Sequence, residues 1–410
     1  MPFVAFCSSI FNPGINAKMH FMDETKNPYE QKVQLFGMAV EPCVKGDLFA
    51  GINYKTCVVA NAPILNHPKN YTGDVFRLDF KDKPEAGAYL SVLSLNLDAH
   101  GILIRTYHHE INSPLLKTQK QDLLPTFVEG ITAKFNSNKS ELVLGGYSRI
   151  FGKGAKNPTK KGKFITITDS INQEKNTNDN YLVMVGYNFK DSQSKIGSSI
   201  YYYKILKHFI VTKDGIEKEN SPIYIYADLN LGYKNTFPSK TMINGELITD
   251  NRHNLWVFSI QGLHLEDGLK NQMGIFGLRT IYKYSNFPMA YFISINTASQ
   301  KNSGLKLPFE TDPTYTATND FYLSSLDEPN WALSLKNKLF LSKINLDFYF
   351  SHFRGKDRQK FSKATIYGAK LESKFSKHIW FEMFMQNQIF TNREKDTSSL
   401  KTQLNVSLSY

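Results

Sequence analysis

The chain has 410 residues, of which 41% are hydrophobic, 21% charged and 13% aromatic, and this composition excludes an intrinsically disordered protein. No segment approaches the roughly 18 to 20 consecutive apolar residues of a membrane-spanning helix, so a helical membrane protein is excluded as well. The net charge of +12 fits nucleic acid, an anionic surface or acidic solutes, and selects none of them. The mean hydropathy of −0.36 is typical of soluble proteins, but a transmembrane barrel has a similar average because its strands alternate apolar and polar residues.

The first 30 residues show no complete targeting signal. Residues 1–17 contain a short apolar patch and small residues near Ala17, but they lack the basic start of a signal peptide. We interpret residues 1–30 as an N-terminal segment outside the folded domain, with a truncated signal-peptide remnant at its start.

The chain has three cysteines, Cys7, Cys43 and Cys57, which are too few for a fold built on disulfides. No second pair of cysteines is present to complete a zinc site. Cys43 and Cys57 have two interpretations, a disulfide formed in an oxidising compartment or two free thiols, and we favour the free thiols.

Further along the chain the dominant pattern is an alternation of apolar and polar residues, which is typical of strands with one face in an apolar phase and the other in water. The last run shows it best, since Leu404, Val406 and Leu408 alternate with polar residues up to the C-terminus. In chain order the runs, some of them weaker, lie at residues 35–40, 48–59, 89–97, 131–135, 181–189, 227–233, 254–261, 344–350, 367–371 and 400–410.

Counting such runs predicts an all-β fold, a transmembrane antiparallel β-barrel of about 16 to 18 strands, with 18 favoured. A soluble sandwich rarely needs so many long strands, and a propeller would show a repeat of about 40 residues, which is missing here. The links between runs are alternately short and long, with long outer loops near residues 152–179 and 298–330. We therefore expect one barrel domain over residues 31–410. Aromatic residues near the ends of many runs predict girdles at the two membrane interfaces, among them Tyr181, Phe189, Tyr201 to Tyr203, Tyr282, Tyr284, Phe381 and Phe384.

Two stretches carry a resemblance to a known family. The terminal strand, ending in Tyr410, resembles the C-terminal signature of bacterial outer-membrane barrels that the barrel-assembly machinery recognises. Residues 121–125, followed by Glu129, Gly130 and an alternating strand, resemble the OprD-type outer-membrane porins and the related Helicobacter outer-membrane (Hof) family. The resemblance covers the chain after about residue 30.

This resemblance implies a monomeric 18-stranded barrel in the bacterial outer membrane, whose third long loop folds inward as a constriction. It also implies passage of small, often carboxylate-bearing solutes along inward Arg and Lys side chains that face acidic loop groups. The sequence departs from the family at the N-terminus, where no clear first strand can be recognised.

The alternation identifies basic residues that should face the lumen, because a charge at the lipid midplane would cost about 2 to 4 kcal/mol. A basic lumen would concentrate small anions and hold their carboxylates. In the alternative interpretation each residue only solvates the lumen and pairs with acids such as Asp79, Asp228, Asp347 and Glu372. The candidate pore-lining residues are Arg77, Arg105, Lys134, Arg149, Arg279, Lys283 and Lys370, and Arg149 is expected to share a face with Glu141 and Tyr147.

No catalytic or metal-binding constellation is evident. His108 and His109 precede Glu110, but neighbours on a strand point to opposite faces and do not share a metal ion easily. We expect no enzyme activity, no cofactor and no metal.

Three functions remain in competition. The first is a porin for small hydrophilic, anionic solutes, surrounded by outer-membrane lipid and lipopolysaccharide and without a nucleic-acid partner. The second is a surface adhesin or structural barrel that acts through its long loops. The third is a soluble basic β-protein that binds an anionic polymer.

Overall fold

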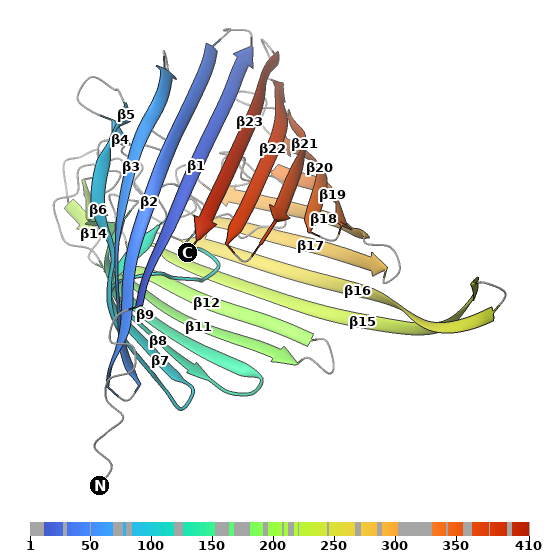
Figure 1. Ribbon diagram of the computed structural model, residues 1–410, viewed down its shortest axis with the longest axis horizontal. Coiled ribbons are helices and arrows are strands. Elements are labelled where there is room, and N and C mark those ends of the chain that lie inside the picture. Colours follow the sequence, from blue (N-terminus) through green and yellow to red (C-terminus); the bar gives the residue numbers. More distant parts are fainter. Residues whose placement is uncertain are drawn as a thin grey trace.

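Strands dominate the computed structural model, and nearly all of them belong to one antiparallel sheet (Figure 1). Among the described residues the sheet has 19 strands, of which 18 form a wall; the remaining one, the three-residue β10 (Phe164–Thr166), pairs there with β9 alone. No helix in the described residues has the length and apolar character needed to cross a membrane. The structure describes residues 12–27, 31–49, 51–68, 77–78, 84–118, 126–151, 164–167, 181–191, 196–206, 209–211, 217–219, 221–243, 246–266, 272–284, 289–301, 330–341, 343–355, 363–376, 378–391 and 396–409.

Wall strands that are neighbours in the chain are also neighbours in the sheet. The wall consists of β1 (Asn12–Asn27), β2 (Gln31–Phe49), β3 (Ile52–Pro68), β6 (Gly87–Ala99), β7 (Ile102–His109), β8 (Phe127–Asn136), β9 (Ser140–Phe151), β11 (Tyr181–Asp191), β12 (Ile196–Leu206), β15 (Ile223–Ile243), β16 (Glu246–Glu266), β17 (Gln272–Tyr284), β18 (Met289–Lys301), β19 (Asn330–Leu341), β20 (Ile344–Gly355), β21 (Lys363–Lys374), β22 (Ile379–Thr391) and β23 (Asp396–Ser409). Two small separate sheets pair β4 (Arg77–Leu78) with β5 (Pro84–Glu85), and β13 (Phe209–Val211) with β14 (Glu217–Glu219).

The first and last strands close the sheet into a barrel. β1 pairs with β2 on one side and with β23 on the other, in a register that runs from Asn16 opposite Ser409 to Asn27 opposite Ser398. The predicted all-β barrel with 18 strands is therefore confirmed. The structure differs from the expected barrel boundary at residue 31, because β1 lies before it and supplies the backbone partners that β2 and β23 need.

The two faces of the wall differ as the alternation predicts. On β23, Leu400 and Leu408 are exposed on the outside, whereas Ser399 and Asn405 are buried on the inside. The same contrast holds on β16, where Phe258 and Ile260 are exposed and Gln261 is buried. An outer surface covered with exposed Leu, Ile and Phe is stable in contact with lipid, whereas a polar inner surface requires water.

An aromatic row marks one boundary of the apolar outer band. Tyr233, Trp256, Tyr282 and Tyr291 occupy directly opposed positions on β15 to β18, and the rings of Trp256 and Tyr282 are 4.4 Å apart between centroids. Amphipathic rings are stable at the interface between lipid and water, so this row fits a girdle.

Other residues of the predicted girdles have a different position. Tyr201, Tyr203 and Phe384 are buried on the inner face, so their assignment to a girdle is wrong. They alternate with outer residues such as Tyr202, which shows that the strand phase, and not ring type, decides their direction.

The links follow two patterns, as expected from the sequence. Tight turns join β2 to β3 and β6 to β7, and they need Gly51 and Gly101, whose φ values are +77° and +80°. Longer links lie at the opposite rim. The predicted outer loops near 152–179 and 298–330 fall mostly outside the described residues.

At the rim that carries the short turns, β15 and β16 continue as a two-stranded ribbon (Figure 1). The pairing of β12 with β15 stops at Leu231, and β17 ends at Tyr284, opposite Asn254 of β16. β15 and β16 remain paired with each other as far as Ile243 and Glu246. The ribbon begins next to the aromatic row and therefore extends away from the apolar band.

Inward tyrosines lie over glycines of the neighbouring strand. Tyr201 is directly opposite Gly186, and Tyr349 is directly opposite Gly368. A Cβ atom at Gly368 would lie 2.3 Å from the backbone oxygen of Met385 and 2.7 Å from the Tyr349 hydroxyl oxygen. Aromatic rings that cover inward glycines stabilise strongly curved sheets, so these pairs fix the curvature of the wall.

We expect Gly368→Ala to destabilise the barrel by about 1 to 3 kcal/mol, because the backbone oxygen of Met385 cannot move away as a side chain can. The measurement is the temperature at which the barrel loses its compact migration in SDS gels. Gly262→Ala is the matched control, since a Cβ atom there meets nothing within 4 Å. Equal effects of the two substitutions would contradict this explanation.

Cys43 and Cys57 form a disulfide, so our preference for free thiols is wrong. The two residues are directly opposite each other in the register of β2 and β3, and their Cα atoms are 4.2 Å apart. The bond lies on the inner face, in a cluster with the buried Val92, Phe127 and Phe151. It ties the β2–β3 hairpin close to the turn.

Replacing both cysteines with serine should lower the free energy of unfolding by about 3 kcal/mol, as expected for closing a loop of this size. Denaturation of the folded protein with and without a reducing agent measures the effect. The reductant should lower the free energy of unfolding of the parent and leave that of the double variant unchanged, because the variant has no disulfide between residues 43 and 57. Alkylation of Cys43 and Cys57 in the unreduced, unfolded protein would show that the disulfide is absent.

Candidate functional site

Residues 111–118, which belong to the link between β7 and β8, form a small hairpin inside the barrel, which we call the inner hairpin. The backbone N–H of Ser113 donates to the carbonyl of Leu116 at 2.9 Å, and that of Thr118 donates to Ile111 at 2.8 Å. These bonds define a tight turn around Pro114, so the segment has a fixed shape although it belongs to a link.

The inner hairpin is attached to the inside of the wall by its apolar residues. Leu115 and Leu116 are fully buried in the same cluster as Tyr147 of β9 and Tyr203 of β12, which both point inward. The backbone N–H of Leu115 also lies 3.4 Å from the Tyr203 hydroxyl, to which it donates. The hairpin therefore occupies part of the lumen, as the resemblance implies for the third long loop.

A charged cavity of about 210 Å³ opens beside the end of β7. The Lys55 ammonium on β3 is 2.7 Å from a carboxylate oxygen of Glu110, and the Arg105 guanidinium on β7 is 3.5 Å from the Glu110 carbonyl oxygen. The other lining residues are Asn53, Val92, Ser94, Asn96, Asp98, Leu103 and His109. Amide, hydroxyl and cationic donors thus converge on one polar site next to the inner hairpin.

A row of alternating charges follows the inner wall from β19 toward the seam between β23 and β1. Asp347 on β20 is almost fully buried, and its carboxylate oxygens are 2.7 Å from Lys336 and 3.7 Å from Lys338, both on β19. Lys338 also lies 3.8 Å from the carboxylate of Glu372 on β21. The carboxylates fix the two lysines in place.

The row continues across the seam. The Lys370 ammonium is 2.8 Å from Glu372 and 2.5 Å from Glu382 on β22. The Asn405 amide donates to Glu382 at 2.9 Å, and its oxygen lies 2.6 Å from the His20 ring on β1. Polar side chains on the inner face therefore bridge the two strands that close the barrel.

Most of the predicted pore-lining residues do lie on the inner face. Arg105 lines the charged cavity, Lys134 pairs with Glu141 at 2.9 Å, and Lys370 belongs to the charged row. Arg279 lies 3.3 Å from the hydroxyl of the buried Ser259, and Lys283 lies 5.2 Å from the centroid of the Phe340 ring. The alternative interpretation also holds for Lys134 and Lys370, since each of them pairs with a carboxylate.

Two of the predicted residues are placed differently. Arg77 belongs to β4, which pairs with β5 in a small sheet separate from the wall, so Arg77 is not part of a wall strand. Arg149 follows a bulge in β9, where Tyr147 is opposite Gly130 but Arg149 is opposite Glu129. The extra residue interrupts the alternation that would place Arg149 on the same face as Tyr147.

Sequence reasoning missed several inward charges. Lys336 and Lys338 have the same two-residue spacing as the recognised runs, so the alternation contained a signal for them. Lys55 lies inside a run that we recognised, but its pairing with Glu110 requires a contact between distant segments. The inner hairpin has no periodic signal, and its residues could not be found by alternation.

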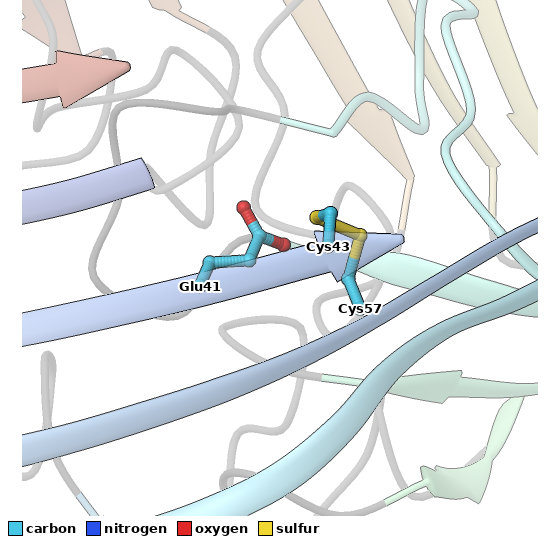
Figure 2. Close-up of side chains that lie close together, drawn as sticks. All are labelled: Glu41, Cys43 and Cys57. Atoms are coloured by element: carbon cyan, nitrogen blue, oxygen red, sulfur yellow. A yellow bond between two sulfur atoms is a disulfide. The ribbon is translucent and has the colours of Figure 1, made fainter. Parts of the chain in front are cut away.

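Among the described residues, one group of metal-ligand side chains lies close together: Glu41, Cys43 and Cys57 (Figure 2). Their ligand atoms are all within 4.8 Å of one another. The two sulfur atoms are joined in the disulfide, however, and a metal needs the free thiolates. Glu41 instead accepts hydrogen bonds from Asn16 at 3.3 Å and Ser91 at 3.4 Å.

Several solved structures have the same fold as this chain. OccAB1 of Acinetobacter baumannii has a TM-score of 0.71 and 10% identity, covering 97% of this chain and 96% of its own. OpdK of Pseudomonas aeruginosa, solved with vanillate, has a TM-score of 0.69 and 8% identity, covering 97% and 99%. A BenF-like porin from Pseudomonas fluorescens Pf-5 has a TM-score of 0.67 and 9% identity, covering 98% and 99%. No family model and no curated protein matches the chain, and identities this low show the fold alone.

Releasing the inner hairpin should widen the lumen. In the double variant Leu115→Ser and Leu116→Ser the apolar attachment to Tyr147 and Tyr203 is lost, because burying two hydroxyls there is unfavourable. We expect a larger and noisier single-channel conductance in a planar bilayer, with unchanged resistance of the wall to heating in SDS. A conductance equal to that of the parent would mean that the hairpin does not narrow the path.

Proposed function

We propose that this protein is an outer-membrane porin for passive diffusion of small hydrophilic solutes, preferentially anionic or carboxylate-bearing ones. The observation that carries the proposal is a polar, charged inner surface that is narrowed by the inner hairpin inside a wall with an apolar exterior. Such an arrangement offers solutes a wet path through lipid. The low-identity structural neighbours support this function through their fold.

The preference for anions rests on how the inward cations are partnered. Lys134 and Lys370 are bound to carboxylates, whereas Lys283 lies over the Phe340 ring, 5.2 Å from its centroid. The electric field of a cation among neutral partners is not compensated by a nearby carboxylate, so it attracts a passing anion more strongly than a cation in an ion pair does. OpdK was solved with vanillate, which bears a carboxylate, and this adds support for the same solute class.

The implied surroundings are outer-membrane lipid and lipopolysaccharide, with the barrel-assembly machinery during biogenesis. The terminal strand that resembles its recognition signature is β23, and it completes the barrel against β1. Passive diffusion requires no enzyme activity and no cofactor. Membership of the Helicobacter outer-membrane family stays a prediction from the resemblance, as does the alternative adhesin role, which depends on loops outside the described residues.

Purified protein in a planar bilayer should give discrete channels with a preference for anions. Arg105→Gln removes one cation from the charged cavity, so we expect the anion-to-cation permeability ratio to fall by about two- to five-fold. Reversal potentials in a salt gradient measure this ratio. The matched control is Lys139→Gln, at the turn between β8 and β9, where Lys139 pairs with Asp191 at 3.3 Å. A silent parent protein, or one that prefers cations, would refute the proposal.

A further inference from the structure

The two faces of the inner hairpin differ in exposure. Ile111, Ser113, Leu115, Leu116 and Thr118 are buried against the wall. Asn112 and Lys117 are exposed and lie directly opposite each other in an antiparallel bridge. Because the hairpin lies on the inside of the wall, its exposed face is turned toward the open lumen.

Hydrogen bonds hold this exposed pair in place. The backbone N–H of Ile111 donates to the Thr118 hydroxyl at 3.0 Å, and that hydroxyl donates to the carbonyl of Thr126 at 2.5 Å. These bonds tie the base of the hairpin to the start of β8. The backbone that carries Lys117 is therefore fixed before a solute arrives, so little ordering is required on binding.

Lys117 differs from the cations of the wall. Lys55, Lys134 and Lys370 each have a carboxylate oxygen within 3 Å of the ammonium. In the described part of the chain, by contrast, no ion pair involves Lys117. The Lys117 ammonium is exposed to water on the inner hairpin, which narrows the lumen. Its charge therefore acts on every solute that passes.

We propose that Lys117, together with the Asn112 amide beside it, is the specificity-determining pair of the channel and selects small solutes with a carboxylate. The ammonium supplies the charge and up to three donors, and the amide supplies further donors to the same group. This inference rests on the proposed porin function and names the residues that set its preference.

The test compares variants in planar bilayers under a gradient of potassium acetate. Lys117→Gln should lower the acetate-to-potassium permeability ratio by about two- to five-fold, and Lys117→Glu should lower it further, because the field of one charge near the path is removed or reversed. Lys117→Arg keeps the charge and should retain the ratio. Lys139→Gln removes the same charge at the rim and should leave the ratio unchanged.

A second variant leaves Lys117 in place. Asn112→Asp puts a carboxylate opposite the ammonium and should also lower the ratio, and resistance to heating in SDS shows whether each variant is folded. If the parent conducts but Lys117→Gln and Asn112→Asp keep its ratio, the inference is wrong and the porin function stands. If the parent does not conduct, both are wrong.

Discussion

The structure depends on one requirement, that every backbone N–H and C=O group at the level of the lipid must be bonded within the protein. A sheet meets this requirement only when its first and last strands pair, since an open edge in hydrocarbon would leave a row of unsatisfied groups. β1 and β23 supply that pairing from residues 16–27 and 398–409. The alternation of the side chains, the curvature of the wall and the existence of a lumen all follow from this closure.

Closure also determines which residues can meet inside. His20 and Asn405 are 385 positions apart in the sequence, yet their side chains are hydrogen-bonded because their strands are neighbours at the seam. Through Glu382 and Lys370 the same contacts continue into β21. The inner charged side chains from β19 to β22 thus pair with one another, and fewer of their charges remain for solutes than the composition suggests.

The sequence predicts this fold well wherever the two-residue period is unbroken. It fails at three kinds of position. β1 alternates Ile15, Ala17 and Met19 with inward Lys18 and His20, but this strand overlaps a segment whose apolar and small residues are also typical of a signal peptide. Cys43 lies eight residues before Gly51 and Cys57 six residues after it, and a register shift between Asp47 and Phe49 brings them directly opposite each other. This shift is a property of the pair of strands, so the sequence alone does not predict the disulfide. The bulge at Gly130 and Tyr147 shifts the phase for Arg149 and carries no clear local signal, since an extra residue is visible only against its partner strand.

The inner hairpin marks the limit of such reasoning. Membrane and backbone constraints fix the outer face and the pairing of the strands, and they leave the inner face and the links free to vary. Structures that are about 10% identical to this chain can therefore have the same wall and different lumens. Here the hairpin is attached by two leucines to tyrosines that also cover the inner wall, so packing and selectivity depend on the same contacts. The backbone groups of the wall strands are hydrogen-bonded without the hairpin, so the side chains of the site can change without loss of the barrel. The preference of the site for a solute therefore has to be determined from the residues of this chain.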